Sequence, residues 1–227
     1  MCSHYTALKK QEQMEKYFQA RGIPLPAKSD MWPGYQGPFI RRPPEHDAGD
    51  EAVPEREAVI ARWGMIAPST PPDKLAKAEK IATFNAKSET AHTLWTFRLA
   101  WAKGRRCIIP AEAIFEPDWR PVYEQRGDHP IPTRFTRADG APLGIAGLWD
   151  RYRDAAGQWQ TSYTMLTINA DHDPLFQNYH QSGKEKRMVV ILPEGAYHDW
   201  LTAPVADTRD FLAPYPADRL VAEPQPK

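Results

Sequence analysis

The hydrophobic positions of the chain fall into short runs, separated by segments rich in proline, glycine and charged residues. Runs with β-branched and aromatic residues predict strands over residues 57–63, 106–110, 113–116, 131–137, 143–153 and 161–168. The apolar run 188–192 predicts a buried strand, and residues 38–41 and 83–86 predict short extended segments. Asp139-Gly140 and Ala156-Gly157 are typical of hairpin connections.

Helical signals are weaker and lie mostly outside the strand-rich region. Residues 6–21 carry a partial apolar stripe that ends before Gly22, which predicts a helix. Shorter helices are expected over residues 74–80, 94–102, 193–201 and 207–212, and a short helix or a turn over residues 174–179. Since no internal repeat and no linker separates two cores, we expect one α+β domain over residues 1–213. Its core should be a curled, barrel-like antiparallel sheet with peripheral helices, followed by a mobile tail over residues 214–227.

Composition narrows the class of protein. The chain has 23 prolines in 227 residues, about twice the average usage of about 5%, which argues against a helical bundle. No apolar run approaches the roughly 18 residues that span a bilayer, so we expect a cytoplasmic protein without a membrane partner. Net charge is zero, which does not favour nonspecific nucleic-acid binding, although residues 71–106 hold eight basic and three acidic side chains.

Common cofactor and metal motifs are missing from the sequence. No dinucleotide-binding or phosphate-loop glycine motif occurs, and no two of the seven histidines have metal-ligand spacing. The two cysteines are too few for a disulfide framework or a four-ligand zinc site. We therefore expect no cofactor and no metal. Cys107, inside an apolar run, is expected to be a core residue.

Cys2 has a position that permits unusual chemistry. Methionine aminopeptidases remove Met1 when the second residue is small, and the new N-terminal cysteine then carries a free α-amine beside its thiol. The α-amine, with an ordinary pKa of about 7.7–8.0, can condense with an aldehyde to an imine near neutrality. The thiol can then close a five-membered thiazolidine ring. A cysteine inside the chain cannot react in this way, because its nitrogen belongs to an amide.

Five motifs occur in a fixed order along residues 1–213. They are Met1-Cys2-Ser3-His4-Tyr5, Trp63-Gly64-Met65-Ile66, Phe84-Asn85-Ala86-Lys87-Ser88-Glu89-Thr90, Arg106-Cys107-Ile108-Ile109-Pro110-Ala111 with Phe115-Glu116, and His180 with Lys186-Arg187-Met188. Together they resemble the SRAP family, the SOS-response-associated peptidases, also called abasic-site processing proteins.

The resemblance implies a function and a set of roles. Family members bind single-stranded DNA containing abasic sites, and their N-terminal cysteine attacks the ring-opened sugar to form a thiazolidine crosslink that protects the lesion. By position, Cys2 would be the nucleophile, Asn85 would hold the N-terminal residue and the sugar, and Glu116 would be the general acid and base. His180 would assist sugar ring opening. Predicted autopeptidase, hydrolase and lyase activities also follow from the family.

These side chains suit that chemistry. A histidine near its ordinary pKa of about 6.5 can move a proton to the sugar ring oxygen, and a partly buried glutamate with a raised pKa can protonate the departing water. Without the resemblance, Asn85 could equally end a strand, Glu116 would be read as a surface glutamate, and His180 as an exposed loop histidine.

Contacts to DNA are expected at five positions: His4, Trp63, Lys87, Arg98 and Arg187. Trp63 is the family's aromatic at the bend of the strand, with a buried core residue as the alternative. Several positions differ from the common family pattern: Ser3-His4 replaces Gly-Arg, Lys87 replaces arginine, a second tryptophan is missing after Gly64, and six residues separate His180 from Arg187.

Three hypotheses of function therefore stand. The leading one is a monomeric abasic-site protein that crosslinks to single-stranded DNA through Cys2 and is nucleoid-associated when bound. The second is a thiol peptidase acting on proteins, with Cys2 and His180 as the working pair. The third is a noncovalent single-stranded DNA-binding module, which would bind intact and abasic strands equally.

Overall fold

The computed structural model describes residues 2–20, 26–46, 49, 52–120 and 129–225. The strands are β1 (His4–Ala7), β2 (Asp30–Met31), β3 (Gln36–Arg41), β4 (Glu57–Trp63), β5 (Asn85–Lys87), β6 (Arg106–Asp118), β7 (Ile131–Arg137), β8 (Leu143–Arg153), β9 (Trp159–Asn169), β10 (Arg187–Val189), β11 (Ile191–Leu192) and β12 (Leu220–Pro224). The α-helices are α1 (Gln11–Phe18), α2 (Leu75–Ala78), α3 (Arg98–Ala102) and α4 (Tyr197–Thr202), and short 3-10 turns link several elements.

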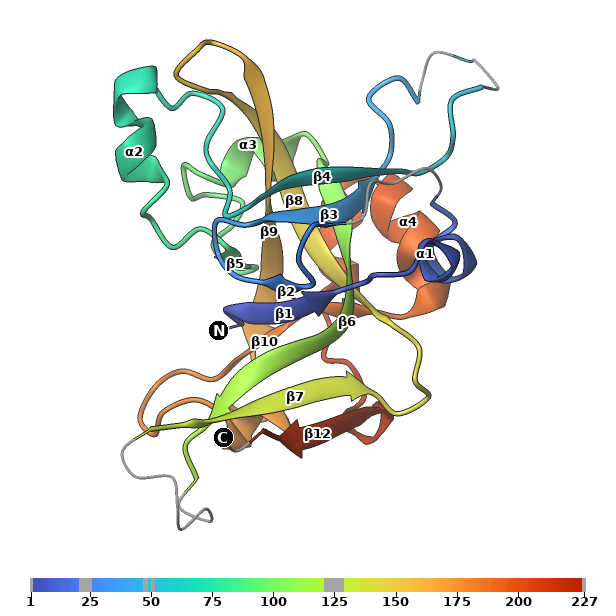
Figure 1. Ribbon diagram of the computed structural model, residues 1–227, viewed down its shortest axis with the longest axis vertical. Coiled ribbons are helices and arrows are strands. Elements are labelled where there is room, and N and C mark those ends of the chain that lie inside the picture. The colour runs from blue at the N-terminus through green and yellow to red at the C-terminus, as the bar shows by residue number, and fades with distance from the viewer. Residues whose placement is uncertain (1, 21–25, 47–48, 50–51, 121–128, 226–227) are drawn as a thin grey trace.

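Five strands close into a barrel, in the ring order β8, β9, β4, β3, β6 and back to β8. The remaining strands attach outside this ring, and the short helices lie around it (Figure 1). This confirms the expected α+β class with a curled, barrel-like core. At Gly147 on β8 a Cβ atom would lie 2.4 Å from the Thr164 carbonyl on β9, so the close pairing of these two strands requires glycine there.

Large apolar side chains from the strands fill the barrel, and the helices add to the same core. Phe39, Tyr163 and Met165 are fully buried inside it. Helix α1 buries Met14 and Phe18, whereas α4 docks on β6 through Trp200, whose indole nitrogen donates to the Cys107 carbonyl at 2.8 Å. Cys107 is a buried core residue, as expected from the sequence.

Three of the strands have the predicted bounds, namely β4, β7 and β8, while the N-terminal prediction is partly wrong. Residues 4–7 form β1, which pairs with β6, and the helix begins only at Gln11. Tyr5 and Ala7 are buried while His4 and Thr6 are partly exposed, an alternation that fits a strand. Pairing with β6 therefore overrides the local helical stripe.

Strand β6 corrects two further predictions. Residues 106–118 form one continuous strand instead of two, with an irregularity where Ala7 pairs with Ala111 and Thr6 with Ala113. Its first half pairs with β8 and its second half with β7. The turn at Asp139-Gly140 consequently joins two strands that do not pair with each other, whereas Ala156-Gly157 does close the β8–β9 hairpin.

The C-terminal segment also differs from expectation. Residues 220–224 form β12, which pairs antiparallel with β7 over five positions, and Tyr215 is buried. Residues 220–224 are therefore held by the sheet, within the segment for which the sequence predicted a mobile tail. Among the described residues, no helix is long and apolar enough to cross a membrane.

Candidate functional site

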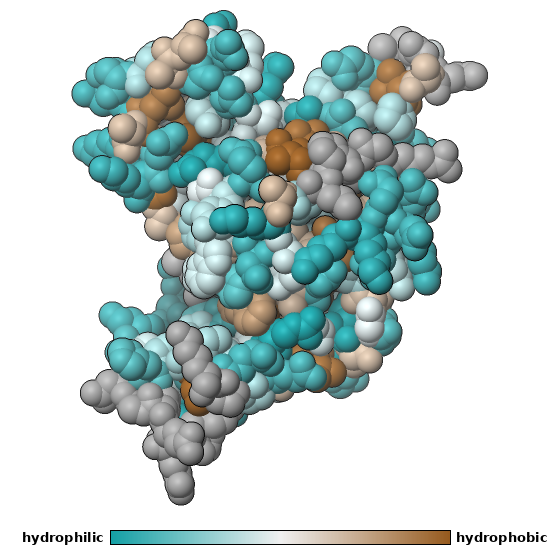
Figure 2. All heavy atoms as spheres, in the orientation of Figure 1, coloured by the Kyte–Doolittle hydropathy of each residue, from teal (hydrophilic) through white to brown (hydrophobic). Residues whose placement is uncertain are grey.

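The C-terminal end of β9 brings separate parts of the chain together. Strand β5 runs parallel to β9 with Lys87 opposite Thr167, while β10 runs antiparallel with Arg187 opposite Asn169. In Figure 1 the N mark, at the start of β1, lies on the same side as β5 and the orange segment leading into β10. Figure 2 shows an indentation of the surface on this side, between the region around α2 and the region around β7.

Cys2 lies at this junction and is 1% exposed. Its thiol donates to the His4 carbonyl oxygen at 3.3 Å, and its own carbonyl accepts a 2.6 Å hydrogen bond from Nδ2 of Asn85. Asn85 is itself buried, and its Oδ1 has no hydrogen-bond partner in the part of the chain that the structure describes. The asparagine therefore holds Cys2 with one end of its amide and presents a buried acceptor with the other.

Glu116 and His180 form the second half of the site. Glu116 is near the end of β6 and is 1% exposed, and its Oε2 lies 3.2 Å from Nε2 of His180. The backbone N–H of His180 donates to the Pro117 carbonyl at 2.9 Å, and its Nε2 lies 3.1 Å from the Arg187 carbonyl. A carbonyl can only accept, so Nε2 carries a proton. The histidine adopts a left-handed backbone conformation, with φ of 64°.

Burial sets the protonation of this pair. It raises the pKa of Glu116 to about 7 and lowers the pKa of His180 to about 4. Near neutrality, then, the histidine is neutral and the glutamate exchanges its proton. This corrects the expectation that His180 titrates close to its ordinary pKa: the group poised for acid–base work at pH 7 is Glu116.

The thiol of Cys2 responds to the same environment. Burial raises its pKa far above the ordinary value, and the negative charge of Glu116 raises it further. At neutral pH the sulfur is consequently a thiol and not a thiolate. Because a thiolate is the nucleophile in cysteine chemistry, a base must take the proton as the sulfur reacts. Glu116 is the carboxylate whose charge acts on this sulfur.

Two of the cations predicted to contact DNA are already paired with carboxylates. Lys87 is about half exposed and forms an ion pair with Glu185. Arg187 is 3% exposed, and its guanidinium contacts Glu89 at 2.9 Å and Glu185 at 2.8 Å. Arg98 is exposed at the start of α3, while His4 lies 3.2 Å from Asp30.

Trp63 is in the core. It is fully buried, its indole nitrogen donates to the Phe84 carbonyl at 2.9 Å, and its ring meets Tyr5 edge-on at 4.9 Å. The structure thus places it where the alternative reading of the sequence had it, and no nucleotide can reach its face. Through Tyr5 and Phe84 it packs between the segments that carry Cys2 and Asn85, which fixes their separation.

Sequence reasoning missed several residues that shape the site. Glu89 and Glu185 neutralise the predicted cations, and the Lys87 ammonium holds the pKa of Glu185 below its ordinary value. Lys186 donates to the His180 carbonyl at 3.0 Å and so closes the loop that precedes β10. One signal was available: acidic residues flank both cationic motifs, in Lys87-Ser88-Glu89 and Glu185-Lys186-Arg187.

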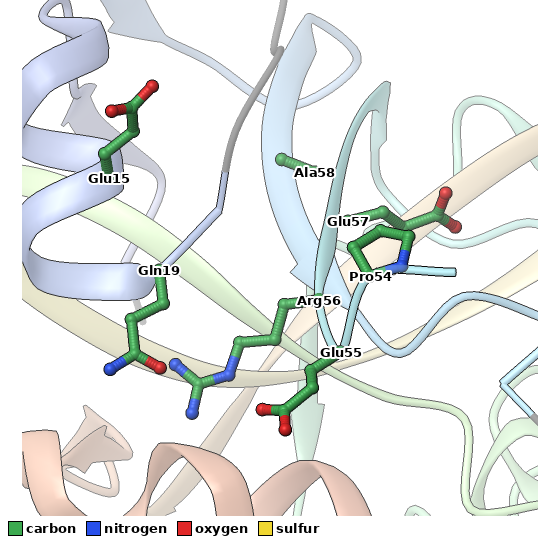
Figure 3. Close-up of a pocket in the computed structure, with 7 residues that line it drawn as sticks. All are labelled: Glu15, Gln19, Pro54, Glu55, Arg56, Glu57 and Ala58. Atoms are coloured by element: carbon green, nitrogen blue, oxygen red, sulfur yellow. The ribbon is translucent and has the colours of Figure 1, made fainter. Parts of the chain in front are cut away.

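A cavity of about 640 Å³ lies elsewhere, between α1 and the start of β4 (Figure 3). Its lining contains the carboxylates of Glu15, Glu55 and Glu57 beside Arg56, and none of the predicted site residues. The cavity is therefore separate from the junction around Cys2, and its carboxylates repel phosphate. Within the described part of the chain, no cluster of three His, Cys, Asp or Glu residues could hold a metal ion.

Solved structures of other proteins share the fold of this chain. A protein from Bordetella bronchiseptica, solved by X-ray crystallography, is 67% identical with a TM-score of 0.89, and each chain covers 100% of the other. A crystal structure from Bacteroides thetaiotaomicron shares the fold, with a TM-score of 0.78 at 19% identity over 98% of this chain and 91% of that one.

A curated relative from Gallus gallus is named abasic site processing protein HMCES. It is 24% identical over 188 residues, which cover 74% of this chain and 52% of that protein. The chain thus spans about half the length of the curated relatives it matches. The model of the family described as SOS response associated peptidase (SRAP) matches residues 1–226. With the junction of Cys2, Asn85, Glu116 and His180 inside that match, the chain belongs to the SRAP family.

Proposed function

We propose that this protein captures abasic sites in single-stranded DNA, with Cys2 as its N-terminal residue after loss of Met1. The observation that carries the proposal is the convergence of four separate segments on one buried junction. Asn85 binds the backbone of Cys2 at 2.6 Å, and Glu116, which acts on the Cys2 sulfur, lies 3.2 Å from His180. Membership of the SRAP family, and the name of the Gallus gallus relative, support the same reading.

The first step is imine formation. The α-amine of Cys2 attacks the aldehyde carbon of the ring-opened sugar, and the resulting hydroxyl leaves as water to give a carbon–nitrogen double bond. Glu116 in its protonated form donates the proton that this water carries away. The free Oδ1 of Asn85 accepts a hydrogen bond from the amine or from the sugar hydroxyl.

The second step closes the ring. Loss of water leaves a protonated imine. The Cys2 sulfur forms a bond to its carbon, and the double-bond electrons move to nitrogen, which keeps the proton that it already carries. Glu116, now a carboxylate, removes the thiol proton and thereby returns to its starting state. His180 remains neutral, with its Nε2–H between the Arg187 carbonyl at 3.1 Å and the Glu116 carboxylate at 3.2 Å, and so it orients that carboxylate.

A thiol peptidase with a Cys2–His180 pair fits less well. Such enzymes lower the pKa of the cysteine so that a thiolate attacks, whereas burial here raises the pKa of the thiol. The thiazolidine route needs no preformed thiolate, since the amine reacts first. The imine then presents an electrophile within the same residue.

The test uses the purified protein and single-stranded oligonucleotides. An intact mass lower by one methionine, followed by a product with abasic DNA that survives a denaturing gel, is the expected result. Intact DNA, and abasic DNA whose aldehyde has been reduced to an alcohol, should give no such product. A protein that retains Met1, or forms no product with abasic DNA, would contradict the proposal.

Glu185 is expected to weaken binding of the DNA backbone, because it occupies the cations that would contact phosphate. Replacing Glu185 with glutamine should raise the noncovalent affinity for single-stranded DNA by about 3- to 10-fold at low salt, with the gain shrinking as salt is added. Fluorescence anisotropy in a Cys2→Ala background measures this without crosslinking.

The matched control for that variant is Glu57→Gln. Glu57 is also an acid in an ion pair, with Arg41 at 2.6 Å, but it lies at the start of β4, at the other end of that strand from Trp63. Equal gains in affinity from the two variants would mean that only net charge matters. If Glu185→Gln did not raise the affinity for single-stranded DNA, Glu185 would not compete with phosphate for these cations.

A further inference from the structure

Three aromatic rings form a column next to Cys2. The His4 ring lies between Trp32 and Phe115, with centroid distances of 4.2 Å and 4.1 Å and interplanar angles of 5° and 13°. His4 and Phe115 are directly opposite in the β1–β6 pair, so the sheet itself fixes the lower two rings. The column stands two residues from Cys2 on one strand and next to Glu116 on the other.

Trp32 is the outer member of the column and is 44% exposed. Its inner face covers His4, so its exposed area belongs to the outer face and the edges. Three tryptophans are this exposed in the described part of the chain, but they differ in environment. Trp159 lies under Arg151 and Arg153, and no ring stacks on Trp95, whereas Trp32 extends an aligned stack.

The turn that carries Trp32 is rigid. Residues 32–35 form a turn closed by the Tyr35 N–H on the Trp32 carbonyl at 2.9 Å, and the backbone of Trp63 bonds this turn at Gly34 and Tyr35. Gly34 has φ of 90°, a conformation that L side chains rarely adopt, and the Arg62 guanidinium donates to its carbonyl at 3.1 Å. Trp32 is therefore held in place before any ligand arrives.

We propose that the outer face of Trp32 takes a nucleobase that flanks the lesion, so that the base becomes the fourth ring of the column. This inference rests on the proposed function, because it needs a single strand threaded past Cys2. A flat aromatic ring on a rigid turn has the chemistry that holds single strands, because stacking tolerates any base. The stack sets where the strand runs and thereby presents the sugar to Cys2.

The test couples a protein change to a DNA change. Wild type, Trp32→Leu and Trp32→Phe are compared on abasic single strands in which each flanking base in turn is replaced by a spacer without a base. Trp32→Leu should lower the second-order rate of crosslinking by about 5- to 100-fold, the usual range for one stacked base, and Trp32→Phe should retain most of the rate. At one flanking position, the spacer should slow wild type by a similar factor yet scarcely affect Trp32→Leu.

Controls separate stacking from other effects. Trp159→Leu removes an equally exposed tryptophan about 25 Å along β9 from Thr167, and should leave the rate unchanged. A merely structural role for Trp32 would slow every DNA equally and give additive effects with every spacer. The inference would be overturned if the effects of Trp32→Leu and of the spacer on the crosslinking rate were additive at every flanking position, or if Trp159→Leu lowered the rate as much as Trp32→Leu. Crosslinking by the wild type would still support the proposed function in either case.

A second measurement decides the matter if wild type forms no crosslink. In the Cys2→Ala background, anisotropy with an intact single strand and its spacer derivatives reports binding alone. A loss of affinity in Trp32→Leu that vanishes with one spacer supports base stacking on its own. Affinity that does not depend on Trp32 contradicts it.

Discussion

Replacing Cys2 with alanine is expected to abolish the DNA–protein product that survives denaturation. Alanine keeps a free α-amine once Met1 is removed, so it can still form an imine with the abasic sugar. It has no sulfur to close the ring, and water reverses the imine during denaturation. The expected loss is therefore complete on a gel without reductant, while borohydride added during the reaction should trap an imine product.

The matched control is Cys107→Ala, which removes the other cysteine. Cys107 is fully buried on β6 in the barrel, and its thiol has no place in the proposed chemistry. This variant should crosslink at the wild-type rate once its folding has been checked by melting temperature. Stable crosslinking by Cys2→Ala would exclude the thiazolidine, and equal affinity of every variant for intact and abasic strands would favour a noncovalent module.

Much of the barrel could be predicted from the sequence, because the residues within and next to each strand are enough to indicate it. The bounds of β4, β7 and β8 follow from apolar runs between turn residues. What local patterns cannot show is pairing between distant segments. Residues 4–7 form a strand because they pair with β6, more than 100 residues away, and residues 220–224 form one because they pair with β7.

For the candidate site, the identity of the main residues could be predicted from the sequence, but their protonation and ion pairs could not. Cys2, Asn85, Glu116 and His180 were chosen by resemblance, and the structure brings them together across the fold. Their protonation could not be foreseen, since it depends on burial: His180 looked like an exposed loop residue, and its pKa is lowered to about 4. The ion pairs of Arg187 with Glu89 and Glu185 likewise depend on how β5 and β10 flank β9.

Replacing Glu116 with glutamine is expected to slow crosslinking by about 10²- to 10⁴-fold, the usual contribution of one general acid–base. The pH profile should change shape as well. In wild type the rate needs a free amine, with a pKa of about 7.7–8.0, and a protonated Glu116, whose pKa is about 7, so the profile is bell-shaped. Glutamine removes the falling limb, and the residual rate should rise with pH to a plateau.

The same substitution should have the opposite effect on stability. Burial raises the Glu116 pKa from 4.5 to about 7, so the folded protein keeps a proton that the unfolded chain loses between these values. Wild-type stability is therefore lost as pH rises through this window. Glutamine needs no proton, so Glu116→Gln should be the more stable protein at pH 8, by on the order of 3 kcal/mol, with the difference vanishing near pH 4.

Denaturant unfolding at several pH values measures that difference, and Glu112→Gln provides the control. Glu112 lies on the same strand but is partly exposed and outside the site, so its variant should track wild type in rate and in stability at every pH. If Glu116→Gln slowed crosslinking but was no more stable than wild type at pH 8, ionisation of Glu116 in the folded protein would cost little free energy. Loss of rate combined with gain of stability would instead show that the fold keeps a destabilising buried carboxyl because the reaction uses it.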